Sequence, residues 1–319
     1  MNSSILLLVF FFLAIFAVSS IECDDADIGG IFSGVSGLLG SIGGLAGAAG
    51  GKKKVCLSLC SRTTHYVVKA NISRDTVDKL ELVGDHLSAY LRTKTSSFRV
   101  LGAASREDAP DGLSVVVINE QTVTVAWNTE VGCLQTFWSD EKEGFRQIGI
   151  YLANLFEKAL RKKYRYVVRK TSFWMIDWMQ DQLNSSYSAL VPGDEELNSE
   201  DYLYILNKCT AKALYLNARP TEEISHLDSF IPRDILRINH GLWFRLEHLI
   251  KLECQEIRIA NSYFTGKRCN FILKHWLGGG FKCLKFLQLD TMGPLDEEMI
   301  TNGLHAKLVP VDYARTFHG

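Results

Sequence analysis

Four short segments in the second half of the chain share one pattern: an apolar residue, any residue, an apolar residue, and then asparagine or aspartate. They read ALYLNA, ILRIN, EIRIAN and FLQLD, and their equivalent apolar positions are Leu214, Leu236, Ile257 and Leu287. These positions follow one another at steps of 22, 21 and 30 residues. Alternation with a period of two predicts strands with one buried face. Recurrence at such steps is typical of a repeat architecture.

Helical patterns lie between the last of these strands, in residues 243–253 (WFRLEHLIKLE) and 266–277 (GKRCNFILKHWL). Thr265 and Gly278 are placed to cap the second helix. Its buried stripe is predicted to consist of Cys269, Ile272, Leu273 and Trp276. The predicted fold class is therefore α/β, with a leucine-rich-repeat-like body that carries parallel strands on one face and helices on the other. The asparagines would bond the backbone where the chain leaves each strand. A βαβ sheet without repeat ancestry is the alternative.

The segment before this body predicts a short β-meander over residues 79–128. Its pieces KLELV, LSAYL, FRVLG, LSVVVI and TVTVAW alternate with period two and are divided by turn residues, which indicates five antiparallel strands. From Gly144 the apolar spacing changes to three and four, which predicts a helix to about Leu160. Further elements are predicted as strands at 164–168 and 188–191, a helix around Met179 and a helix that begins at Asn198. We place one domain at 79–310, with its repeat-like α/β part at 144–304.

The first 54 residues have a different character. Residues 1–20 contain an apolar stretch that ends in small residues, which is typical of a cleaved signal peptide. Residues 21–54 form a glycine-rich, low-complexity linker. Within it, residues 28–50 carry no charge and are long enough to cross a bilayer, but their glycines disfavour a helix, so this is a weak transmembrane candidate. If it spans, the lysines at 52–54 place the body in the cytosol, a type I topology.

The eight cysteines give a second indication of location. Cys209, Cys254 and Cys283 each precede a strand-like run, where a free cysteine is expected to be a small buried hydrophobic residue. Free thiols favour a reducing compartment, whereas the leader predicts entry into the secretory pathway. The sequons at Asn71 and Asn184 would accept glycans only if the body enters the lumen. Localisation therefore remains open between these alternatives.

No motif in the sequence indicates an enzyme. G-x-S-x-G, H-E-x-x-H, P-loop and G-x-G-x-x-G patterns are missing, so no catalytic or cofactor-binding residue is predicted. No metal site is predicted either, since Cys254, Cys269, His275 and Cys283 lack the spacing of a ligand set. Residues 157–170 combine seven basic residues with two tyrosines, and we interpret them as a solvated helix end and not as a nucleic-acid surface.

Residues 241–289 resemble a known family. The sequences LWF, LEHLIKLECQEIRI, CNFILKHWLGGG and LKFLQL are similar to the second type of F-box-associated domain, which forms the C-terminal part of a large nematode family of F-box proteins. Weaker similarity extends over residues 79–304. The residues that match the family motif are Trp243, Phe244, Leu246, Leu249, Asn270, Trp276 and Gly279.

The resemblance also explains residues 55–72, which look like the closing portion of an F-box. In that family the F-box is a small helical bundle that docks onto a Skp-type adaptor of a cullin ubiquitin ligase. The adaptor contacts implied here are Leu57, Leu59, Val67 and Val68. The entry segment and first helix of the F-box are missing, and glycines occupy their place. Because helices of a bundle need partners to bury their apolar faces, adaptor docking by this remnant is doubtful.

These observations lead to a function without catalysis. We expect a protein-recognition module that resembles the substrate-binding part of an F-box subunit, with a protein target as its partner, no cofactor and no nucleic acid. The alternative is a secreted or membrane-anchored protein, held through residues 28–50, whose folded body binds an extracellular or lumenal partner. The identity of the target is not encoded in any motif.

Overall fold

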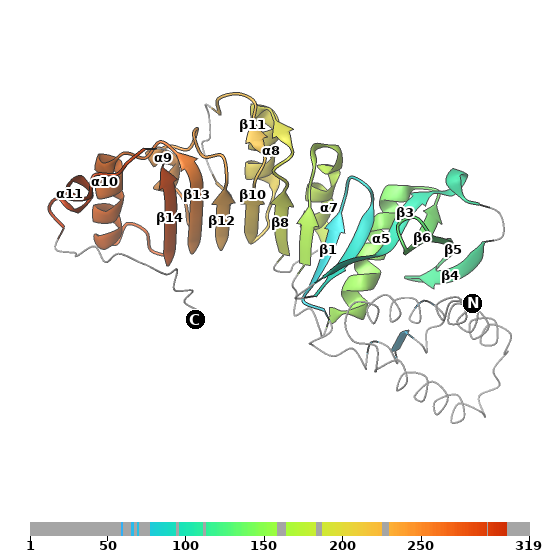
Figure 1. The fold of residues 1–319 in the computed structure, drawn as a ribbon. Coiled ribbons are helices and arrows are strands. Elements are labelled where there is room, and N and C mark those ends of the chain that lie inside the picture. Colours follow the sequence, from blue (N-terminus) through green and yellow to red (C-terminus); the bar gives the residue numbers. More distant parts are fainter. Residues whose placement is uncertain are drawn as a thin grey trace, which may run out of the picture. The chain divides into compact units, whose positions relative to one another are not determined.

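The computed structural model describes residues 77–93, 96–110, 113–157, 164–182, 187–224, 230–291 and 293–304, together with residues 59, 65, 66 and 69. The chain divides into two compact units, unit 1 from Met1 to Val167 and unit 2 from Val168 to Gly319. Both units combine strands with helices (Figure 1). The predicted α/β class is confirmed.

Unit 1 contains a mixed sheet with the strand order β7-β1-β2-β3-β6-β5-β4. Its strands are β1 (Lys79–Val83), β2 (Ser88–Arg92), β3 (Ser97–Ser105), β4 (Ser114–Ile118), β5 (Gln121–Asn128), β6 (Cys133–Trp138) and β7 (Tyr164–Val167), and a 3-10 helix η1 (Arg106–Asp108) follows β3. The pairs β1–β2, β2–β3, β4–β5 and β5–β6 are antiparallel. The pairs β1–β7 and β3–β6 are parallel.

The five predicted strands are all present, but the prediction of a simple meander is wrong. After β3 the chain crosses to the far edge of the sheet, and β6 returns to pair with β3 in parallel. This sixth strand was not predicted, because CLQTFW does not alternate cleanly: Cys133, Thr136, Phe137 and Trp138 are all buried. Thr136 is buried although it is polar, because its hydroxyl group is hydrogen-bonded. It donates to the Gly102 carbonyl at 2.8 Å and accepts from Trp138 Nε1 at 2.6 Å.

Helix α5 (Glu141–Leu155) packs against this sheet and begins at Asp140, whose carboxylate accepts from the backbone N–H groups of Lys142 and Glu143. The sequence pattern predicts this helix from Gly144 to about Leu160, whereas α5 ends at Leu155; residues 158–163 lie outside the described part of the chain. Gly144 is required by close packing, because a Cβ there would lie 2.2 Å from Trp138 Cγ. The buried face of α5 includes Phe145, Ile148 and Leu152.

Unit 2 contains five parallel strands in the order β14-β13-β12-β10-β8. They are β8 (Tyr187–Val191), β10 (Ala213–Leu216), β12 (Ile235–Ile238), β13 (Glu256–Ser262) and β14 (Phe286–Thr291), and a second small parallel sheet pairs β9 (Glu196–Leu197) with β11 (Arg219–Pro220). The register confirms the equivalent positions of the sequence pattern, because Leu214 pairs with Leu236, Leu236 with Ile257, and Ile257 with Leu287. The first three of these residues are fully buried.

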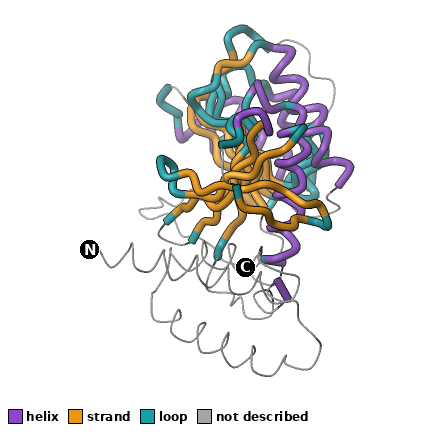
Figure 2. The backbone as a smooth tube through the Cα atoms, turned by 90° about the vertical axis from the view of Figure 1, so that its right-hand side faces the viewer, coloured by secondary structure: helices purple, strands orange, loops and turns teal. Residues whose placement is uncertain are grey.

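The helices of unit 2 connect these strands. They are η2 (Lys170–Ser172), α7 (Trp174–Gln182), α8 (Ser199–Lys208), α9 (Leu246–Leu249), α10 (Gly266–Leu277) and α11 (Glu297–Thr301). Figure 2 shows helices lying beside the strands. Asn198 caps α8 by accepting from Asp201 N at 2.8 Å, as predicted. The helix predicted at 243–253 is a single turn only, because Trp243 and Phe244 are buried in a turn before it.

The N-terminal predictions concern residues that the structure does not describe. The signal peptide, the glycine-rich linker and the candidate span at 28–50 all lie outside the described residues, and so do Asn71 and Asn184. Among the residues that are described, no helix has the length and hydropathy of a membrane span.

Candidate recognition surface

Side chains that alternate with the buried leucines and isoleucines of unit 2 form a partly exposed surface on its parallel sheet. Five of them touch one another in series across four neighbouring strands, and we call them the arginine ladder: Tyr215, Arg237, Glu256, Arg258 and Phe286. Tyr215, Arg237, Glu256 and Arg258 each lie one residue away from a buried apolar position, and Phe286 lies next to the half-buried Leu287.

Glu256 is the centre of the arginine ladder. One of its oxygens, Oε1, accepts from Arg237 Nη2 at 2.7 Å and from Arg258 Nε at 2.7 Å. Burial acts to raise the pKa of Glu256, but the hydrogen bonds and charges of the two arginines outweigh it and leave the pKa below its ordinary value. The carboxylate is therefore held in its charged form between two guanidinium groups.

Each arginine also covers an aromatic ring. The guanidinium carbon of Arg237 lies 5.1 Å from the ring centre of Tyr215, and that of Arg258 lies 4.6 Å from the ring centre of Phe286. Cation–π contacts of this kind hold long side chains in one conformation. Arginine and tyrosine are also enriched among the residues that dominate the energy of protein interfaces. The ladder thus provides an ordered surface of the composition used to bind proteins.

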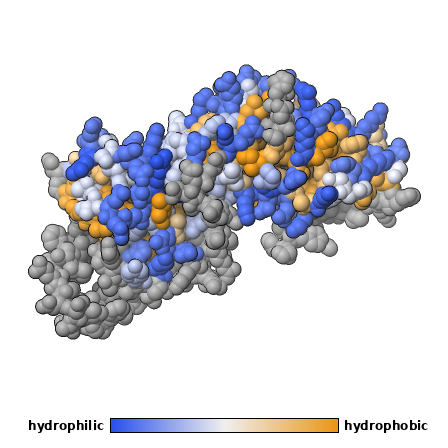
Figure 3. Space-filling model, turned by 180° about the vertical axis from the view of Figure 1, so that it is seen from behind, coloured by the Kyte–Doolittle hydropathy of each residue, from blue (hydrophilic) through white to orange (hydrophobic). Residues whose placement is uncertain are grey.

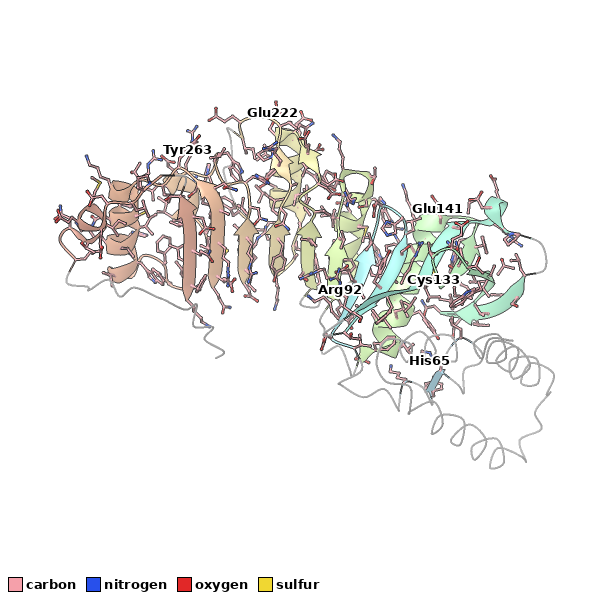
Figure 4. All side chains as sticks on the ribbon, viewed as in Figure 1. His65, Arg92, Cys133, Glu141, Glu222 and Tyr263 are labelled. Atoms are coloured by element: carbon pink, nitrogen blue, oxygen red, sulfur yellow. The ribbon has the colours of Figure 1, made fainter. Side chains whose placement is uncertain are left out.

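The carboxyl ends of the strands in unit 2 carry the asparagines that the sequence pattern singled out. Asn261 has a left-handed backbone (φ 52°), and its side-chain amide donates to the Asn239 carbonyl of the neighbouring strand end at 2.8 Å. For Asn261 the predicted bond to backbone at the exit from a strand is confirmed. Glu222 and the 59% exposed Tyr263 lie on the same edge of unit 2 (Figure 4).

The family-motif residues form the interior around these strands. Trp243 and Phe244 are buried in a ring cluster with Tyr202, Phe230 and His248, with neighbouring ring centres 5.4 to 6.2 Å apart. Leu249 is fully buried, and Leu246 is half-buried. Burial lowers the pKa of His248, whose Nδ1 accepts from Arg245 N at 3.1 Å. Trp243, Phe244 and Leu249 therefore pack the interior of unit 2.

The remaining motif residues organise α10 and its surroundings. Asn270 donates to the carbonyls of Ile300 and Asn302 at 2.7 and 2.9 Å, which ties α10 to the end of α11. Trp276 is half-buried. Gly278 is the C-cap of α10, as predicted. Gly279 has φ 82° and its N–H donates to the Trp276 carbonyl, while the Gly280 N–H donates to the His275 carbonyl, so the helix ends in a Schellman motif. In the predicted stripe of α10 only Ile272 is fully buried, and Cys269, Leu273 and Trp276 are intermediate.

Two described residues of the segment 55–72, which is predicted to be an F-box remnant, contact α5 and Glu157 just beyond its end in unit 1. Leu59 is only 3% exposed. His65 Nδ1 lies 3.3 Å from Tyr151 Oη, and Lys69 bonds Asn154 and pairs with Glu157 at 3.5 Å. Leu57, Val67 and Val68 lie outside the described residues. Of the predicted adaptor contacts, only Leu59 is therefore described, and it is a buried position.

The described thiols do not form a reactive or metal-binding group. Cys209 and Cys254 are buried as predicted, and burial raises the pKa of both, that of Cys254 to about 11. Cys283 is exposed, contrary to the prediction, because it lies in the turn before β14 and not on its buried face. Among the described residues no cluster of histidine, cysteine and carboxylate side chains could hold a metal ion.

In the basic segment at 157–170, the structure describes Glu157 and residues 164–170. Tyr164 and Tyr166 are buried, and Arg165 lies 3.8 Å from the carboxylate of Glu81. Arg169 pairs with Asp194 and Glu195 at 2.8 and 2.7 Å. The aromatic rings of this segment are thus part of the core, and these arginines are matched by acids.

Comparison with known proteins adds one finding. Residues 225–289 match the family model described as F-box associated, and this region holds β12, α9, β13, α10 and most of β14. The F-box-associated family is a protein-interaction module. No curated protein and no solved structure matches the chain. Four of the five ladder residues lie inside the matched region: Arg237, Glu256, Arg258 and Phe286.

Proposed function

We propose that this chain is a non-enzymatic recognition protein that binds a protein target through the arginine ladder of unit 2, in the manner of the substrate-binding part of an F-box subunit. The observation that carries this proposal is the position of the ladder: four of its five residues lie within the region that matches the F-box-associated family. Their charged and aromatic side chains are ordered by contacts with one another and remain partly exposed.

The surface suits a protein better than a small molecule. The ladder spans neighbouring strands from β10 to β14, so it offers a broad contact area and not a closed pocket. The two arginines and one glutamate give the ladder a net charge of +1, which favours an acidic or phosphorylated segment in the target. Hydrophobic side chains are also exposed elsewhere on unit 2, among them Leu242, Tyr263 and Phe271. Figure 3 shows hydrophobic side chains at the molecular surface.

The test is capture of partners by the full chain with matched variants. Tagged wild type, Arg258→Ala and Arg268→Ala are expressed in the same cells, and associated proteins are quantified by mass spectrometry. Both substitutions remove one arginine of unit 2, but Arg258 is a half-buried ladder residue, whereas Arg268 is exposed on α10 and contacts the Tyr263 carbonyl. Partners that bind the ladder are lost from Arg258→Ala and kept by Arg268→Ala. Equal partner sets for all three proteins contradict the proposal.

Ligase assembly is a separate step of this proposal and has its own test. Leu59 is buried in unit 1, so we expect no stable complex with a Skp-type adaptor in co-expression. Endoglycosidase treatment separates this function from the secreted or membrane-anchored alternative. A mass shift that disappears with Asn71→Gln or Asn184→Gln places the body in the lumen and excludes a role in a cytosolic ligase.

A further inference from the structure

Strand β4 of unit 1 is the last strand of its sheet among the described residues. The sheet order ends at β4, and among the described residues no strand pairs with its outer edge (Figure 1). The strand reads SVVVI and contains no charge and no proline. Edge strands of soluble proteins are normally guarded by charges, proline or bulges, because an open edge pairs readily with another strand. An unguarded edge of this kind therefore indicates a partner strand.

Strand β4 is held in an extended conformation by its hairpin with β5. Asn119 and Glu120 form a two-residue turn with positive φ angles of 46° and 69°, which is the type I′ geometry of a tight hairpin to β5. The Asn119 side chain donates to the carbonyl and side chain of Gln147 on α5, at 2.8 and 2.9 Å. Ile118 is fully buried. The edge is thus anchored at its turn end before any partner binds.

The hairpin geometry decides which backbone groups face outward. In a two-residue hairpin the residues that flank the turn, Ile118 and Gln121, form a hydrogen-bonded pair, and such pairs alternate with non-bonded pairs along the strand. Val116 and Ser114 are then also bonded to β5. The N–H and C=O groups of Val115 and Val117 point away from β5, toward the open edge. Their side chains are 59% and 48% exposed.

We propose that β4 pairs with β4 of a second copy of this chain, antiparallel and with the two-fold axis at Val116. In this register Val115 of each copy lies opposite Val117 of the other copy, which gives two such residue pairs related by the two-fold axis. In each pair the outward N–H and C=O groups of the two residues hydrogen-bond to each other. The exposed valines form cross-strand pairs on one face, flanked on β5 by Thr122 and Thr124. No charge is buried by the contact. The strand is complementary to itself, which identifies a second copy as the occupant.

The contact is small, since five residues extend over about 17 Å. A dimer of this size is weak and depends on concentration. Sedimentation velocity of the full chain over a wide concentration range is expected to show monomer at the lowest concentrations and dimer at the highest. Hydrogen exchange is expected to protect the amides of Val115 and Val117 in the dimer only.

Two double variants test the register. Val115→Lys/Val117→Lys places lysine opposite lysine in both cross-strand pairs of the dimer and is expected to weaken dimerisation at least about tenfold. Val115→Lys/Val117→Glu removes the same two valines but places lysine opposite glutamate twice, so it is expected to dimerise more tightly than the first variant. Circular dichroism checks that both keep their fold, which the exposure of the two positions favours.

Three outcomes overturn the proposal. Wild type that stays monomeric at every concentration shows that the edge has no such partner. A dimer that persists unchanged in Val115→Lys/Val117→Lys forms through another surface. Equal monomeric behaviour of the two double variants shows that Val115 and Val117 do not face each other across a two-fold axis.

Discussion

Arg237 and Arg258 lie directly opposite each other on the neighbouring parallel strands β12 and β13. Like charges in this position destabilise a sheet unless a third group compensates them. Glu256 compensates both, because one carboxylate oxygen accepts from the two guanidinium groups. The arginine ladder is therefore a network with one acid in its middle. Its order, and with it the proposed recognition surface, depends on that residue.

The first prediction concerns removal of this charge. Glu256→Gln leaves the two arginines facing each other without a carboxylate, so we expect a loss of about 1 kcal/mol in the free energy of unfolding. Chemical denaturation in urea measures it. The control is Glu253→Gln, which removes an exposed glutamate from the loop before β13. A loss for Glu256→Gln no larger than for this control contradicts the role of Glu256.

The second prediction is the pH dependence of the same interaction. Because the pKa of Glu256 is lower in the folded chain than in the unfolded chain, its contribution is fully present above the unfolded value of about 4.3 and is lost as the pH falls through the folded value. The difference in unfolding free energy between wild type and Glu256→Gln should be constant near neutral pH. It should shrink below about pH 4. A difference that grows with acidity has the wrong sign for this network.

The third prediction tests the packing of α5. Gly144→Ala places a methyl group 2.2 Å from Trp138 Cγ, where side chains cannot approach without movement of the helix or the ring. Overpacking costs about 1–3 kcal/mol, which should exceed the gain of about 1 kcal/mol from better helix propensity. Thermal unfolding should show a lower melting temperature. Gly193→Ala is the control, because its methyl group meets its nearest atom at 3.6 Å and should change stability little.

The fourth prediction separates backbone strain from steric contact at the end of α10. Gly279 has φ 82° and open space around its Cα, so Gly279→Ala should cost about 1 kcal/mol through backbone conformation alone. Gly279→Asn should cost less, since asparagine tolerates the left-handed region. Urea denaturation of the two variants ranks them. If Gly279→Asn is the less stable one, conformational strain does not explain the glycine.

Local patterns predicted unit 2 well. The register of Leu214, Leu236, Ile257 and Leu287 follows from alternation within each strand. The bounds of α10 lie between the predicted caps Thr265 and Gly278, although the Thr265 side chain makes no capping hydrogen bond. These features depend on residues close together in the sequence. The short α9 is the exception, because Trp243 and Phe244 enter a ring cluster with residues far away in the chain, and tertiary packing overrides the helical pattern.

Features that depend on distant strands were not predictable in this way. The order of unit 1 follows from β6 returning beside β3, and no local pattern in CLQTFW indicates that pairing. The arginine ladder was missed for a similar reason. Arg237 and Arg258 occupy the variable position of ILRI and EIRI, which marks them only as solvent-facing. Their contact with Glu256 and Phe286 becomes visible once β12, β13 and β14 are known to be neighbours.

The last prediction concerns the thiols of unit 2. Burial raises the pKa of Cys254 to about 11 and also raises that of Cys209, so at pH 8 both are protonated and shielded from reagents. Cys283 is exposed in the turn before β14. We expect a maleimide to label Cys283 rapidly in the native protein, and to label Cys209 and Cys254 only after denaturation. Peptide mapping by mass spectrometry distinguishes the three sites. Rapid native labelling of Cys254 would show that β13 and the loop before it open in solution, and would contradict a rigid sheet beneath the arginine ladder.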